Sequence, residues 1–113
     1  MNIVLDYDGV ITANWAHYHQ LAFDLEKSGH NVFILTAANP RRIPGIKKDL
    51  EHFPHTNIYY RKDDFISTPK NIGEWKKEML RLLDASMWFD NEVKNYQLAG
   101  VDFSDLNVAI VRV

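Results

Sequence analysis

Short apolar runs alternate along the chain with longer segments in which apolar residues recur at helical spacing. Apolar runs without polar alternation are typical of strands that are buried on both faces of a parallel sheet. Such runs predict strands at residues 3–5, 32–35, 58–60, 87–89 and 108–111. The segments between them predict helices at about 18–25, 46–53, 72–83 and 93–99.

The alternation of strands and helices indicates an α/β fold. Strands that are joined through right-handed crossovers form a parallel sheet with helices on both faces. We therefore expect a three-layer, Rossmann-like domain with a parallel sheet of about five strands. The length of 113 residues fits a single domain over residues 1–113, and we find no internal repeat or linker.

The composition is that of an ordinary globular protein, with 46% apolar and 25% charged residues. The formal net charge of -2 excludes a global field that would draw the chain to nucleic acid or membrane. The absence of cysteine excludes disulfides and thiol chemistry. No apolar stretch approaches the roughly 18 residues that span a bilayer, and we expect no signal peptide ahead of the first strand. We expect a soluble, cytoplasmic protein without a membrane partner.

Polar side chains follow three of the predicted strands. Asp6 and Asp8 come directly after the first strand, Thr36 after the second, and Asp90 and Asn91 after the fourth. In an open parallel sheet, ligands bind beyond the carboxyl ends of the strands. Carboxylates so close to a core favour a divalent cation. A capping Asp followed by a turn Asp is the alternative for the first pair alone.

Four motifs occur in order along the chain. They are Asp6-Tyr7-Asp8-Gly9-Val10, Ile34-Leu35-Thr36-Ala37, a lysine ahead of the fourth strand, and Trp88-Phe89-Asp90-Asn91. This set resembles the haloacid dehalogenase (HAD) superfamily of aspartate-nucleophile phosphohydrolases. The Asn, Ala and Gly within residues 95–101 also follow the habit of that family. The resemblance covers essentially the whole chain and implies a HAD-like fold.

The resemblance also implies roles for individual residues. Asp6 would attack phosphorus and form an aspartyl-phosphate, and Asp8 would protonate the leaving oxygen and later activate water. Thr36 would hydrogen-bond a phosphoryl oxygen. Mg²⁺ would be held by Asp6, the carbonyl oxygen of Asp8 and Asp90. The further residues expected to contact the substrate are Tyr7, Ala37, Arg41 and Lys70.

Three lysines precede the fourth strand and are candidates for the third motif. Lys76 falls on the apolar stripe of the helix at 72–83, whereas Lys77 points elsewhere. A cation on an apolar face requires an anion, so we expect Lys76 to neutralise the phosphate and Asp6. Lys70, in the preceding loop, remains the alternative.

Asn91 departs from the family pattern, in which many members carry a second acid at this position. Asparagine keeps its hydrogen-bonding capacity but has no charge, which would weaken metal binding. Glu92 or Asn95 can assist from the helix that follows.

The intervals between the motifs are too short for the cap domain that many members of the superfamily carry. About 30 residues separate Asp6 from Thr36, and about 40 separate Thr36 from Lys76. A capless site is open, so we expect a nucleotide, a polynucleotide end or a sugar phosphate as substrate, in that order. No obligate protein partner is indicated, and a homo-oligomer is compatible with the chain. A weakly active or inactive phosphate-binding or scaffold protein of the same fold is the alternative.

Overall fold

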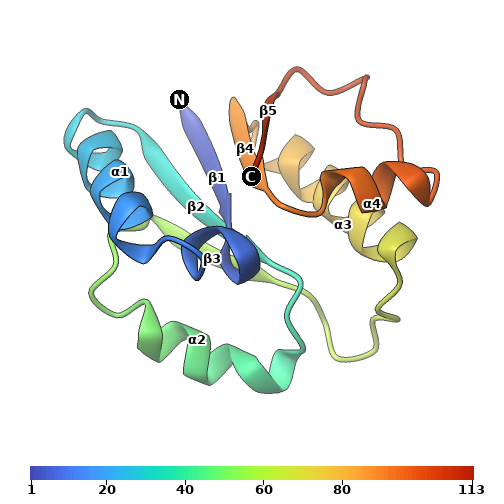
Figure 1. Ribbon diagram of the computed structural model, residues 1–113, viewed down its shortest axis with the longest axis horizontal. Helices are drawn as coiled ribbons and strands as arrows, with labels where there is room; N and C mark the ends of the chain where they lie inside the picture. Colours follow the sequence, from blue (N-terminus) through green and yellow to red (C-terminus); the bar gives the residue numbers. More distant parts are fainter.

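The computed structural model describes all 113 residues as a sheet of parallel strands with helices packed against it (Figure 1). The strands are β1 (Asn2–Asp6), β2 (Asn31–Thr36), β3 (Asn57–Tyr60), β4 (Met87–Asp90) and β5 (Ala109–Arg112). The helices are α1 (Trp15–Lys27), α2 (Ile43–Asp49), α3 (Pro69–Leu82) and α4 (Val93–Leu98). Two short helical turns, η1 (Tyr7–Ile11) and η2 (Pro40–Arg42), follow β1 and precede α2. The prediction of an α/β fold with five parallel strands is confirmed.

The helix predicted at 46–53 is displaced toward the N-terminus. It begins at Ile43, where Pro44 suits the first turn because a proline lacks the N–H that would go unpaired there. It ends at Asp49, yet Leu50 and Phe53 remain buried in the turn that follows. The apolar spacing therefore marked the buried side chains correctly but not the end of the helix.

The strand order in the sheet is β3-β2-β1-β4-β5, and every pair is parallel. β1 lies at the centre, between β2 and β4. From β1 the chain adds β2 and then β3 on one side, and it then crosses to the other side of β1 to form β4 and β5. The ends of β1, β2 and β4 therefore meet at one edge, beside the point where the chain reverses direction across the sheet, which is where ligands bind in such folds.

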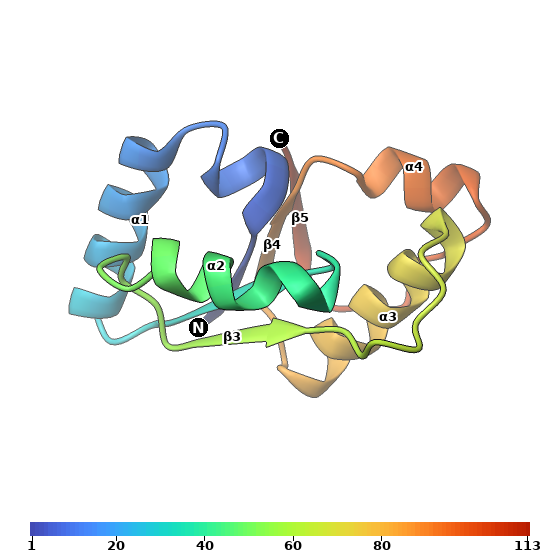
Figure 2. The same ribbon diagram turned by 90° about the horizontal axis from the view of Figure 1, so that it is seen from below.

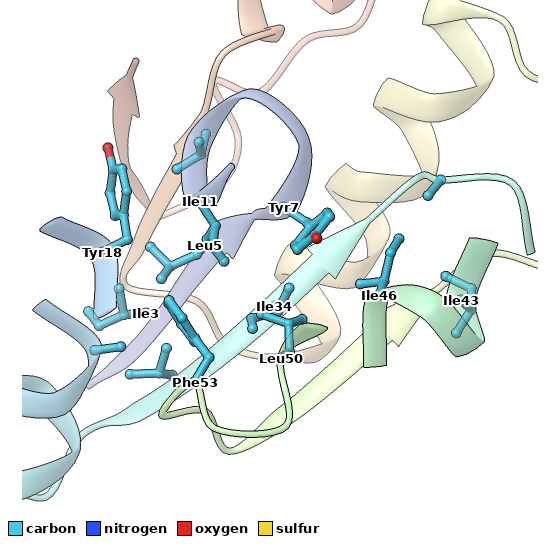
Figure 3. Packing of buried hydrophobic residues seen from close by; sticks show 14 residues of the cluster. Ile3, Leu5, Tyr7, Ile11, Tyr18, Ile34, Ile43, Ile46, Leu50 and Phe53 are labelled. Atoms are coloured by element: carbon cyan, nitrogen blue, oxygen red, sulfur yellow. The ribbon is translucent and has the colours of Figure 1, made fainter. Parts of the chain in front are cut away.

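Successive residues of β1 point to opposite faces of the sheet. Ile3 and Leu5 belong to one buried cluster, with side chains of α1 and of the α2 region (Figure 3). Val4 belongs to a second cluster, with side chains of α3 and α4. Figures 1 and 2 show α1 and the α3–α4 pair on opposite sides of the strands.

α3 approaches α4 closely because its sequence carries a glycine at the contact. A Cβ on Gly73 would lie 2.8 Å from atoms of both Tyr96 and Val101. The helix begins at Pro69, where the side chain of Thr68 accepts the N–H of Asn71 at 3.1 Å. None of the helices in the structure combines the length and apolarity needed to cross a membrane.

Candidate active site

The carboxyl ends of β1 and β2 and the β4–α4 junction line a cavity of about 380 Å³. Because the three strands are neighbours in the sheet, the side chains that follow them converge there. Side chains of α3 and α4 line the cavity as well, and so does the segment that leads into η2. Of the residues predicted for the site, Asp6, Asp8, Thr36, Ala37 and Lys76 line this cavity.

The turn after β1 is fixed by its own hydrogen bonds. The N–H of Tyr7 donates to Asp6 Oδ1 at 3.0 Å, and the N–H of Gly9 donates to Thr12 Oγ1 at 2.9 Å. Gly9 has a φ of +82°, which side chains with a Cβ rarely adopt. A Cβ at Gly9 would also lie 2.1 Å from the side-chain nitrogen of Asn91. Glycine is therefore required for the turn and for the approach of Asn91.

Lys76 lies at the bottom of the site and is only 2% exposed. Its Nζ donates to Asp90 Oδ2 at 2.6 Å and to Asp6 Oδ1 at 3.2 Å. The same atom lies 5.4 Å from the ring centre of Tyr96. One ammonium group thus joins the ends of β1 and β4, whereas Lys77 forms a separate ion pair at the surface.

Burial and this pairing shift the pKa values of the groups involved. Burial raises the pKa of Asp6 to about 7; Lys76 lowers it in part, and Asp90 raises it again. Burial alone would lower the pKa of Lys76, but the carboxylates of Asp6 and Asp90 outweigh burial and raise it. Burial raises the pKa of Tyr96 to about 12. Lys76 therefore stays charged and Tyr96 stays neutral at neutral pH.

The side-chain amide of Asn91 faces two oxygen atoms of the turn. One of the two terminal atoms of the amide, which is nitrogen or oxygen depending on how the amide is turned, lies 3.2 Å from the carbonyl oxygen of Asp8 and 3.2 Å from Asp6 Oδ2. If that atom is the nitrogen, the amide donates to both oxygens. If it is the oxygen, three oxygens converge with no proton between them, and a hard cation satisfies such a set. The first orientation satisfies every atom of the amide, and only the second would suit a Mg²⁺ ion.

Asp90 is fully buried, and hydrogen bonds engage both of its carboxylate oxygens. Oδ2 accepts from Lys76, and Oδ1 accepts the N–H of Glu92 at 2.7 Å. Asp90, the predicted metal ligand, does not line the cavity. The structure contains no group of three or more His, Cys, Asp or Glu side chains that could hold a metal ion. Oxygens that could converge on an ion at the turn would come instead from one carboxylate, one carbonyl and the Asn91 amide in its second orientation.

Asp8 turns its carboxylate to Arg42 at the rim of the cavity. Arg42 Nη1 and Nη2 donate to Asp8 Oδ2 and Oδ1 at 2.8 and 2.9 Å. The hydrogen bonds to Asp8 raise the pKa of Arg42. Both side chains are about half exposed, and exposed ion pairs stabilise a fold by only about 0–1 kcal/mol. Arg42 can therefore exchange Asp8 for another anion at small cost.

Thr36 ends β2 and is 1% exposed. Its Oγ1 accepts the N–H of Ala38 at 3.2 Å, and its hydroxyl group donates to no protein acceptor. Thr36, Ala37 and Ala38 all line the cavity. The hydroxyl proton of Thr36 is thus available to an oxygen atom of a ligand.

Three residues that were predicted to contact the substrate lie outside the cavity. Tyr7 is buried among apolar side chains (Figure 3), and its hydroxyl group donates to Asp49 Oδ2 at 3.1 Å. Arg41 is exposed on η2, and Lys70 is exposed in the first turn of α3. Neither of these two cations lines the cavity.

Arg42 and Tyr96 line the cavity but were not among the site residues predicted from the sequence. Arg42 stands next to Arg41 in a short turn, where no periodicity separates the inward from the outward side chain. Tyr96 matches the apolar stripe of α4 and is indistinguishable from a core residue in sequence. Glu92 also lines the cavity, and the side-chain amide of Asn95 donates to it.

The cavity therefore gathers a buried ammonium group, carboxylates and an unpaired hydroxyl proton from segments that lie far apart in the chain. Compared with protein families, with curated proteins and with solved structures, the chain gives no match. A function for this chain therefore has to be inferred from the geometry of the cavity and from the sequence motifs.

Proposed function

We propose that this protein is a Mg²⁺-dependent phosphomonoester hydrolase that acts through an aspartyl-phosphate. The observation that carries the proposal is the assembly of Asp6, Asp8, Thr36 and Lys76 around one cavity. They belong to the first three of the four motifs, in the same order along the chain, on which the resemblance to the HAD superfamily rests. Phosphoryl transfer requires mostly positioning and neutralisation of charge, and this set supplies both.

The fold proposed with this function is the three-layer HAD-like domain without a cap. The parallel sheet order and the helix pairs packed against both faces of β1 support it. The segment between β1 and β2 consists of η1 and α1, and that between β2 and β3 of η2 and α2. Neither segment has room for an inserted domain.

Mg²⁺ would be held by Asp6, by the carbonyl oxygen of Asp8 and by the side-chain oxygen of Asn91. We prefer Asn91 to the predicted ligand Asp90, because Lys76 and the N–H of Glu92 engage both oxygens of Asp90. When bound, the ion neutralises negative charge on the phosphoryl oxygens and on the Asp6 carboxylate.

In the first half of the reaction, a carboxylate oxygen of Asp6 attacks phosphorus, and the bond from phosphorus to the leaving oxygen breaks. The ammonium group of Lys76 lies 3.2 Å from Asp6 Oδ1 and favours the ionised nucleophile, which burial alone would disfavour. The hydroxyl group of Thr36 donates to a phosphoryl oxygen. Asp8, once it has left Arg42 and taken up a proton from solvent, gives that proton to the leaving oxygen.

In the second half, Asp8 takes a proton from water as the water oxygen attacks phosphorus. The bond from phosphorus to Asp6 breaks, which releases inorganic phosphate and restores the Asp6 carboxylate. Both halves require Asp8 to leave Arg42, because the bidentate pair engages both oxygens of Asp8. An anionic substrate gives Arg42 a new partner and so favours this opening.

The rim of the cavity favours a phosphorylated small molecule or a nucleic-acid end as substrate. Arg42 offers a half-exposed cation beside the proposed phosphate position. Without a cap, the rest of the substrate can extend into solvent. A nucleotide comes first among the candidates, then a polynucleotide end and then a sugar phosphate.

The test is the release of inorganic phosphate from a panel of substrates, with Mg²⁺ and with excess chelator. The panel holds nucleotides, 3′- and 5′-phosphorylated oligonucleotides, sugar phosphates and an aryl phosphate. We expect release that requires both Mg²⁺ and Asp6, so that Asp6→Asn is inactive. Asp24→Asn, a matched change at an exposed position of α1, should behave as the wild type.

Two outcomes would contradict the proposal. Equal release by wild type and Asp6→Asn would exclude the covalent mechanism. No release from any substrate, in folded protein that binds Mg²⁺ and phosphate, would favour a phosphate-binding or scaffold protein instead.

A further inference from the structure

Arg61 is a buried cation for which the proposed reaction has no use. It directly follows β3 and is 7% exposed, and no carboxylate lies within ion-pair distance of it. A buried charge without a counter-ion is expensive unless strong hydrogen bonds compensate it. The partners of Arg61 therefore indicate why it is retained.

Backbone carbonyls and an aromatic ring surround the guanidinium group. Nε donates to the carbonyl oxygen of Ala37 at 2.6 Å, and Nη1 donates to that of Phe65 at 3.2 Å. The guanidinium carbon lies 5.3 Å from the ring centre of Phe65. The shorter of the two hydrogen bonds thus goes to the segment that follows Thr36 in the cavity wall.

The hydrogen bond to Ala37 fixes the orientation of a whole peptide unit. The C=O of Ala37 and the N–H of Ala38 belong to one planar trans peptide and point in opposite directions. With the C=O held by Arg61, the N–H points to Thr36 Oγ1, which accepts it at 3.2 Å. This bond occupies the oxygen of the hydroxyl group and leaves its proton free to donate into the cavity.

We propose that Arg61 is a positioning residue that acts through the Ala37–Ala38 peptide to aim the hydroxyl group of Thr36 at a bound phosphate. Arg61 itself does not line the cavity, so it reaches the ligand only through this peptide. The claim about the peptide is independent of any reaction. The claim about phosphate rests on the proposed function.

The first experiment measures the peptide directly, by hydrogen exchange of the Ala38 amide in NMR spectra. We expect roughly tenfold faster exchange in Arg61→Gln and in Arg61→Lys, because neither keeps the Nε–H donor in place. Arg81→Gln and Arg81→Lys are the matched controls, since Arg81 forms only surface ion pairs on α3. Unchanged protection of Ala38 in a folded Arg61 variant would overturn the proposal.

The second experiment measures the affinity for inorganic phosphate, in the presence of Mg²⁺, by calorimetric titration. We expect roughly tenfold weaker binding in Arg61→Lys and in Thr36→Val, and no further loss in the double variant. Non-additivity of this kind identifies a residue that acts through Thr36. Additive losses, or a lower melting temperature with unchanged phosphate affinity, would show a merely structural role and contradict the proposal.

The two experiments separate failure of this inference from failure of the proposed function. If wild-type protein binds no phosphate, the proposed function fails, and Ala38 exchange still decides the role of Arg61 in holding the peptide. If Arg61→Gln does not fold, Arg61→Lys keeps the positive charge and supplies both measurements.

Discussion

Lys76 keeps its charge in a place that water hardly reaches, because two carboxylates surround it. Asp6 and Asp90 are nearly or fully buried as well, and with both carboxyl groups ionised the three groups together carry one negative charge. Replacing one member of such a cluster leaves the remaining charges buried without a partner. This destabilises a protein more than replacing the whole cluster with apolar side chains does. The lysine is therefore a structural residue as well as a proposed catalytic one.

Replacing Lys76 with Met should destabilise the protein by about 3–5 kcal/mol at neutral pH, because two buried carboxylates lose their cation. The stability that Lys76→Met loses relative to wild type should be smaller at lower pH. Burial already raises the pKa of Asp6 to about 7, and removing Lys76 raises it further. Above about pH 7 the folded variant therefore keeps a proton on Asp6 that folded wild type has lost, so the stability lost relative to wild type grows as pH rises beyond 7.

Urea unfolding of Lys76→Met and wild type at pH 6 and pH 9 measures this effect. Lys77→Met is the control from the next position, where a surface ion pair is lost and a change within about 1 kcal/mol is expected. An equal loss at both pH values in Lys76→Met would show that the carboxylates do not take up protons.

Replacing Asp8 with Asn should lower kcat by about 10²–10⁴-fold, the usual contribution of a general acid and base. Affinity for Mg²⁺ should change little, because the proposed ligand is the backbone carbonyl of residue 8. Steady-state kinetics and a Mg²⁺ titration of the same variant test both statements. Unchanged turnover would refute the assigned role of Asp8.

The turn η1 and the β4–α4 junction meet at a contact that only glycine permits. Replacing Gly9 with Ala places a Cβ against Asn91 in addition to straining the backbone. We expect weaker Mg²⁺ binding and a stability loss of about 1 kcal/mol or more. In Gly29→Ala, at a φ of +88° with no atom within 4 Å, we expect the backbone cost alone. Equal Mg²⁺ affinity in both variants would exclude Asn91 as a ligand.

The packing of α3 on α4 offers a second comparison of glycines. Gly73→Ala should destabilise by about 1–3 kcal/mol despite the better helix propensity of alanine, because the new methyl group meets Tyr96 and Val101. Gly45→Ala in α2 meets no atom within 4 Å and should stabilise by up to about 1 kcal/mol. Thermal unfolding of the two variants measures the difference. A stabilised Gly73→Ala would contradict the close approach.

The helices and strands were predictable from the sequence where the pattern of buried apolar residues alone determines them. Strands buried on both faces leave continuous apolar runs, and Lys76 stood out because it interrupts an apolar stripe. The contact between Asn91 and the turn was not predictable, because it depends on a positive φ at Gly9 and not on periodicity. The pairing of Asp8 with Arg42 joins two loops, which periodicity does not describe either.

At the scale of the whole molecule, the order of the strands in the sheet determines where the polar groups of the site lie. With β1 between β2 and β4, residues 6, 36 and 90 reach one edge although the chain separates them widely. Alternating strands and helices predicted a parallel sheet, and therefore the shared edge. How deeply each side chain at that edge is buried could not be predicted from the sequence. In the structure Asp90 is buried beside Lys76 and does not line the cavity, whereas Asn91 does.

The central claim is that the phosphoryl group passes through Asp6, and trapping that intermediate tests it most directly. Asp8→Asn is mixed with Mg²⁺ and an aryl phosphate, whose leaving group needs no proton, and is quenched in acid for peptide mass spectrometry. We predict one phosphoryl group on the peptide that contains Asp6, and none in the Asp6→Asn, Asp8→Asn double variant. Turnover by the wild-type protein without any phosphoryl group on Asp6 in either protein would contradict the account.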